Sequence, residues 1–157
     1  MAFYQFYKTQ LIPAPIEEVW DFISSPKNLK EITPDSSGFE ITSRNLSEKM
    51  YPGMIISYTV KPVLGIRMLW VTEITYVEEM KYFIDEQRIG PYAMWHHQHF
   101  FEPTGQGVLM TDVVSYSPSL GFLGVLANSI FISKQLKDIF IFRENELQKR
   151  FQRVYFK

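Results

Sequence analysis

All three histidines of the chain lie within four residues, as His96, His97 and His99. In an extended strand successive side chains point to opposite faces, so His97 and His99 share one face and His96 takes the other. Trp95 and Phe101 share the face of His97 and His99, which favours the interior for these two histidines. Imidazole exchanges protons near neutral pH and is the commonest metal ligand in proteins, so this cluster is the first candidate for chemistry.

Two carboxylates are expected beside these histidines. If Glu102 pairs with Gly107 across the intervening loop, His97 lies opposite Asp112. If the hairpin that precedes the histidines pairs its strands symmetrically, Asp85 lies opposite His97. The three side chains then form a row across three strands of one face, and a slip of two residues changes the partners but keeps the groups together.

Three interpretations of this row remain open. The first is a buried polar network, in which the carboxylates satisfy the imidazole N–H groups. The second is a polar anchor for a ligand in a cavity. The third is acid–base catalysis or metal binding, but we expect no tight metal site, because the histidines divide between two faces and the chain has no cysteine. No residue is assigned as catalytic, since neither a Ser–His–Asp pattern nor a cysteine nucleophile is present.

Alternating side chains and turn residues predict the strands that position this row. After a strand at 3–12, the helical period disappears between 38 and 117. Six strands are expected there, at about 38–44, 53–61, 65–78, 81–89, 92–102 and 107–117. The alternation assigns one face of the sheet to Met54, Ile56, Tyr58, Met68, Trp70, Tyr76, Trp95, Phe101, Met110 and Tyr116.

Helical spacing appears on either side of the strands. Two short helices are predicted at 16–23 and 28–32, and one long helix at about 122–155. An antiparallel sheet with one apolar face needs a cover, and only the long helix is large enough. The order predicts an α+β fold in a single domain, residues 1–157, in which a curved antiparallel sheet of about seven strands packs its concave face on the C-terminal helix.

Several segments resemble one superfamily over nearly the whole chain. They are residues 13–23 (PAPIEEVWDFI), 26–34 (PKNLKEITP), 85–92 (DEQRIGPY), 95–101 (WHHQHFF) and 110–116 (MTDVVSY). In these segments the chain is similar to the SRPBCC, or START-like, superfamily of helix-grip proteins, in a branch of small bacterial proteins described as polyketide cyclase/dehydrase-like. The resemblance implies an apolar cavity under the C-terminal helix, without naming a ligand or a reaction.

Composition and charge limit the classes of partner that we expect. The chain has 157 residues, 16 basic and 17 acidic, with a net charge of -1, so we expect no nucleic-acid partner. The first residues lack the basic and apolar segments of a signal peptide, and no apolar run is long enough to span a membrane. We expect a cytoplasmic protein without a cofactor, and the oligomeric state stays open.

The predicted function is binding or carrying of a small hydrophobic molecule, lipid-like or aromatic and polyketide-like, between the sheet and the C-terminal helix. The alternative is an enzyme of the cyclase or dehydratase type, in which His97 or His99 with Asp112 acts as a general acid or base. A protein-interaction module with a closed core is a third possibility. The candidate cavity residues are Tyr58, Met68, Trp70, Asp85, Trp95, His97, His99, Met110, Asp112, Tyr116, Phe122 and Phe140.

The segment between the last strand and the long helix, residues 117–124, contains Pro118, Gly121 and Gly124. These residues favour either an ordinary turn or a gate over the cavity mouth, with Phe122 as part of the closing surface.

Overall fold

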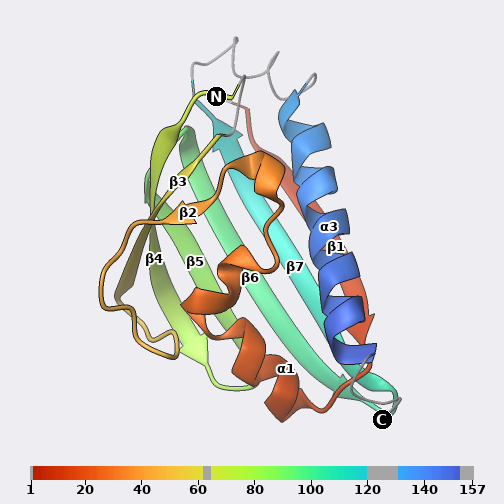
Figure 1. Ribbon diagram of the computed structural model, residues 1–157. Helices are drawn as coiled ribbons and strands as arrows, with labels where there is room; N and C mark the ends of the chain where they lie inside the picture. Colours follow the sequence, from red (N-terminus) through yellow and green to blue (C-terminus); the bar gives the residue numbers. More distant parts are fainter. Residues whose placement is uncertain (1, 62–64, 120–130, 153–157) are drawn as a thin grey trace.

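In the described residues, seven antiparallel strands form one open, curved sheet in the order β1-β7-β6-β5-β4-β3-β2, and a long helix, α3, runs along it beside β1 (Figure 1). The computed structural model describes residues 2–61, 65–119 and 131–152. The predicted α+β helix-grip architecture is confirmed. The strands are β1 Tyr4–Ile12, β2 Glu40–Ile41, β3 Met54–Val60, β4 Met68–Glu78, β5 Tyr82–Ile89, β6 Tyr92–Thr104 and β7 Gly107–Pro118.

The helices follow from the apolar spacing of the sequence. The helix α1 (Ile16–Ile23) buries Val19, Trp20, Phe22 and Ile23. Two 3-10 turns follow it, η1 (Pro26–Lys30) and η2 (Asp35–Ser37). In α3 (Ser133–Gln152) the buried residues recur at intervals of four and seven, which places them on one face: Leu136, Phe140, Leu147 and Phe151.

Two predicted elements differ in extent. The strand predicted at 38–44 consists of Glu40–Ile41 alone, because the amides of Thr42 and Ser43 both donate to the carbonyl of Ser57 and the regular ladder ends there. The helix predicted at 28–32 is the 3-10 turn η1. Residues 120–130 and 153–157 of the predicted long helix and gate lie outside the described residues.

The register between β6 and β7 differs by two residues from the prediction. Thr104 pairs with Gly107, so His99 lies opposite Asp112 and His97 opposite Val114. Pro103 was expected to end the strand, yet it continues β6. The amide of Phe101 donates to the carbonyl of Lys81, the residue just before β5 begins. Pro103 comes two residues later, so its nitrogen faces the same side of β6 but lies beyond the start of β5. Its missing N–H therefore breaks no strand pairing among the described residues.

A bulge in β4 moves Tyr76 away from the concave face to which it was assigned. Ile74 pairs with Asp85 and Tyr76 with Ile84, so Thr75 is an extra residue without a counterpart in β5. This extra residue reverses the alternation. Tyr76 is exposed and stacks on Tyr82, with the ring centroids 5.0 Å apart.

Met68 lies two residues before Trp70 in an unbroken β3–β4 ladder, so it shares the face of Trp70 as predicted, but it is not buried there. Met68 is 37% exposed at the first position of β4. The last pair between β4 and β5 joins Val71 to Ile89, so Met68 extends past β5 and, within the described part of the chain, pairs with β3 alone.

Candidate functional site

A cavity of about 170 Å³ lies between the concave face of the sheet and α3. Residues of β3 to β6 form one wall, and α3 contributes Leu136, Ile139 and Phe140 to the other. Apolar side chains dominate the walls, as is typical of sites for small organic ligands. The aromatic residues of the wall are Phe39, Tyr58, Trp70, Phe83, Tyr92, Trp95 and Phe140.

In one region of the wall, two aromatic side chains contact the same hydroxyl group, that of Thr72. The indole Nε1 of Trp70 donates to Thr72 Oγ1 at 3.0 Å, and the hydroxyl of Tyr58 lies 2.9 Å from the same oxygen. Trp95 meets Trp70 edge to face, with 5.1 Å between the ring centroids. These contacts satisfy the polar atoms of Tyr58 and Trp70, so their rings present apolar surface to the cavity.

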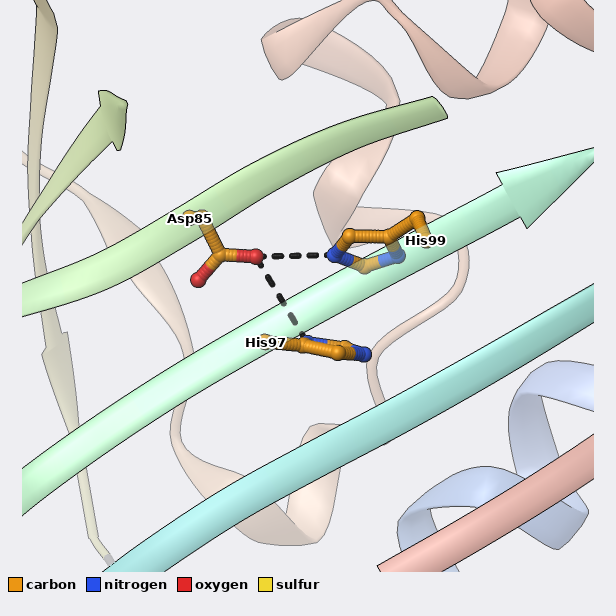
Figure 2. Close-up of side chains that lie close together, drawn as sticks. All are labelled: Asp85, His97 and His99. Atoms are coloured by element: carbon orange, nitrogen blue, oxygen red, sulfur yellow. Dashed lines mark hydrogen bonds and ion pairs between the residues drawn. The ribbon is translucent and has the colours of Figure 1, made fainter. Parts of the chain in front are cut away.

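The polar end of the cavity contains Asp85 of β5 and His97 and His99 of β6 (Figure 2). The register predicted between these strands is confirmed, since Asp85 pairs with His97. Asp85 Oδ2 lies 2.8 Å from His99 Nε2 and 3.5 Å from His97 Nδ1. Both histidines are buried, and their rings lie 3.7 Å apart between centroids.

Asp112 of β7 lies on the other side of the two imidazoles, outside the cavity wall. Its Oδ1 atom lies 2.9 Å from His97 Nε2 and 2.9 Å from His99 Nδ1. The contact with His97 is a hydrogen bond, whereas His99 Nδ1 has no aligned hydrogen-bond partner among the described residues. The predicted proximity of Asp112 to a histidine is confirmed, and each imidazole lies between two carboxylates.

Burial and charge act against each other on these pKa values. Burial favours neutral carboxyls, but His99 and His97 outweigh it and hold the pKa of both Asp85 and Asp112 below its ordinary value. Burial, together with the charge of His99, lowers the pKa of His97. Burial also opposes protonation of His99, but hydrogen bonding and charge attraction from Asp112 and Asp85 raise its pKa above its ordinary value.

Arg143 of α3 also lines the cavity and did not enter the sequence prediction. Its Nη1 atom lies 3.9 Å from Asp112 Oδ1, and its Nε has no hydrogen-bond partner among the described residues. The sequence does contain a pattern that could have identified Arg143. It follows Phe140 by three residues and precedes Leu147 by four, and this spacing places its positive charge on the buried face of the helix.

The structure separates the predicted site residues into groups. His96, on the opposite face, pairs with Glu86 at 2.8 Å. Phe122 lies outside the described residues. Met110, Asp112 and Tyr116 are buried beside the cavity but are not part of its wall, and Met68 is exposed. The residues that line it are Tyr58, Trp70, Asp85, Trp95, His97, His99 and Phe140.

Comparison with known proteins places this geometry in a family. Residues 12–138 match the family model "Polyketide cyclase / dehydrase and lipid transport". The chain belongs to this family. The match extends from the end of β1 into α3 and so includes every residue of the polar end except Arg143. A search of curated proteins found no match.

Solved structures resemble this member of the polyketide cyclase/dehydrase and lipid transport family over nearly their full length. Protein CV1439 from Chromobacterium violaceum is 13% identical with a TM-score of 0.69, covering 94% of this chain and 96% of its own. The protein TTHA0849 from Thermus thermophilus is 17% identical with a TM-score of 0.68, covering 96% and 99%. Protein Ms6760 from Mycobacterium smegmatis is 16% identical with a TM-score of 0.67, covering 96% and 92%. At these identities the likeness establishes the shared fold.

The apolar segments raise the separate question of a membrane span. Among the described residues of this family member, no helix has both the length and the apolar character to cross a membrane.

Proposed function

We propose that the protein binds a small, mostly apolar molecule in the cavity between the sheet and α3, with a polar group of that molecule directed at the histidines. The observation that carries this proposal is an aromatic-walled cavity with Asp85, His97, His99 and Arg143 at one end. Apolar walls supply binding free energy through surface removed from water, and a few polar groups fix the orientation.

The volume supports a compact ligand. An apolar cavity of roughly 150 Å³ is large enough for benzene, and the present cavity has about 170 Å³. The family description names both polyketide cyclases and lipid transport, and a compact aromatic molecule with a polar end matches the first of these more closely. Arg143, with its unpartnered Nε, supplies a donor for a phenolic or carboxylic oxygen of such a molecule.

Two variants of α3 test the cavity. Ile139 lines it, whereas Ile141, on the same helix, is exposed. Replacement of Ile139 by Trp fills the space, and Ile141→Trp adds the same bulk outside it. Binding of 4-methylphenol and of 2-naphthol, each an aromatic ring system with a single hydroxyl group, is measured by isothermal titration calorimetry.

We expect Ile139→Trp to weaken binding by about tenfold or more, equivalent to about 1.4 kcal/mol, and Ile141→Trp to leave it unchanged. Circular dichroism is the check that both variants fold. The proposal fails if wild-type protein binds neither probe and native mass spectrometry of freshly purified protein shows no retained molecule, or if both variants weaken binding equally.

A second candidate is catalysis at the same site, because His97 and His99 face the cavity and contact carboxylates. A histidine held by Asp112 or Asp85 can act as a general acid or base on a bound polyketide-like molecule. The test is whether the protein converts a linear poly-β-keto substrate analogue. Conversion that is lost in His97→Gln and His99→Gln but kept in His96→Gln favours an enzyme. Unchanged recovery of a bound analogue favours the carrier.

A further inference from the structure

We infer that Asp85, His97 and His99 form a binding site for a divalent transition-metal ion of the zinc class at the polar end of the cavity. One donor atom from each side chain lies within 4.8 Å of the donor atoms of the other two. Figure 2 shows both imidazoles directed at the carboxylate of Asp85. All three residues line the cavity, so a bound ion would face the space proposed for the ligand.

The nitrogen atoms of the two rings support this inference. Each imidazole has one nitrogen near Asp85 and the other near Asp112, at distances between 2.8 and 3.5 Å. When both imidazoles are neutral they carry two N–H groups between them, so two of the four nitrogens then present a lone pair to a carboxylate oxygen. A cation between Asp85, His97 Nδ1 and His99 Nε2 replaces that repulsion by coordination.

Asp112 then has the role of an acceptor behind the ligands. A metal-bound histidine usually donates its second ring N–H to a carboxylate, which fixes the tautomer and makes the imidazole a better ligand. Asp112 Oδ1 already accepts from His97 Nε2 and lies at the same distance from His99 Nδ1. A small rotation of the His99 ring aligns its unpartnered Nδ1 with that oxygen.

The donor set selects the class of ion. Two imidazole nitrogens and one carboxylate suit Zn²⁺, Fe²⁺ or Co²⁺, whereas Ca²⁺ and Mg²⁺ prefer oxygen donors alone. Three protein ligands leave at least one coordination position, which faces the cavity here. The sequence argued against a metal because the histidines divide between two faces, but Asp85 supplies the third ligand on the inner face.

The test uses the full-length protein and the metal alone. Protein freed of metal by a chelator is titrated with Zn²⁺ by calorimetry and with Co²⁺ by visible absorption, whose ligand-field bands report coordination by nitrogen and oxygen. The variants are His99→Gln and Asp85→Asn in the site and Asp112→Asn behind it. His96→Gln is the matched control on the same strand, since His96 lies on the other face and pairs with Glu86.

We expect one ion per chain. Replacement of a carboxylate behind a metal ligand costs roughly ten- to a hundredfold in affinity. Asp112→Asn removes the negative charge behind both imidazoles, so we expect it to weaken binding to that extent, and the two ligand variants to weaken it more. His96→Gln leaves the affinity and the Co²⁺ spectrum unchanged. Bound Zn²⁺ also raises the melting temperature of the wild type and of His96→Gln, in proportion to the logarithm of its concentration.

Several outcomes overturn the inference. One is the absence of stoichiometric binding to wild-type protein, which leaves the four side chains as a proton-sharing network. Another is an equal loss in His96→Gln, which identifies surface binding. A third is full affinity in a folded His99→Gln or Asp85→Asn variant. Because no organic probe enters these measurements, their result is independent of the ligand-binding test.

Discussion

The Oδ1 atom of Asp112 accepts a hydrogen bond from His97 Nε2 over 2.9 Å, and both side chains are buried. The same oxygen lies 2.9 Å from His99 Nδ1. A buried carboxylate at this position costs free energy of desolvation, which only its polar partners offset. Asp112 therefore holds the two histidines in the orientation that presents their other nitrogens to the cavity.

Removal of this carboxylate is expected to destabilise the fold strongly. Asp112→Ala leaves two buried imidazoles without their shared acceptor, and the loss of one partner of such a buried group costs about 3–5 kcal/mol. Urea denaturation gives the free energy of unfolding. Glu86→Ala is the control, because the His96–Glu86 pair is partly exposed and its loss costs about 0–1 kcal/mol. Equal losses in the two variants contradict the role given to Asp112.

Alkaline stability is expected to depend on two tyrosines. Burial, and for Tyr58 also the charge of Asp85, raises the pKa of Tyr58 and of Tyr92 above its ordinary value. Below the unfolded pKa of tyrosine, about 10, both hydroxyls are neutral in the folded and the unfolded chain, and the folded protein keeps its full stability. Above it the unfolded chain loses these protons first, so the free energy of unfolding falls as the pH rises toward the folded pKa. Each group then contributes a decline of up to about 1.4 kcal/mol per pH unit.

Urea denaturation between pH 9 and 11.5 measures this decline. Tyr58→Phe and Tyr92→Phe are expected to make it less steep, whereas Tyr7→Phe, which replaces an exposed ring of β1, serves as the control. The same slope in all four proteins contradicts the prediction.

The glycine that begins β7 tests how closely β1 approaches that strand. Gly107 has a φ of +132°, and a Cβ atom added there lies 2.1 Å from the carbonyl oxygen of Ile12. Gly107→Ala therefore strains the backbone and forces β1 away from β7, at a cost of at least about 2 kcal/mol. Gly105→Ala, two residues earlier, meets nothing within 4 Å and is expected to cost less than about 1 kcal/mol. A similar midpoint in urea for both variants contradicts the close approach of Ile12 to Gly107.

Much of the fold could be predicted because glycine and proline residues mark the turns, and apolar and polar residues alternate along the strands. The pairing of Asp85 with His97 followed from the short Gly90–Pro91 connection. The pairing of β6 with β7 did not, because a proline normally ends a strand. Pro103 continues β6 at a position where, among the described residues, no neighbouring strand needs its missing N–H.

The site could be predicted only in part. The polar row depends on strand alternation, so Asp85, His97 and His99 were identified together. Arg143 belongs to a helix whose rotation on the sheet no local pattern specifies. The cavity forms where α3 does not fill the space under the curved sheet. Its volume depends on how the two elements pack, which no residue type encodes.

The position of β1 at the edge of the sheet constrains the order in which the chain assembles. Its strand partner is β7, with Tyr4 opposite Tyr116 and Ile12 opposite Val108, so each pair closes a loop of about a hundred residues. During synthesis β1 emerges first but has no partner until β7 has been made. Contacts this distant in sequence slow folding, so we expect the β1–β7 ladder to form late and the hairpins from β3 to β7 to nucleate the sheet. The first strand translated is thus among the last to become protected from amide hydrogen exchange.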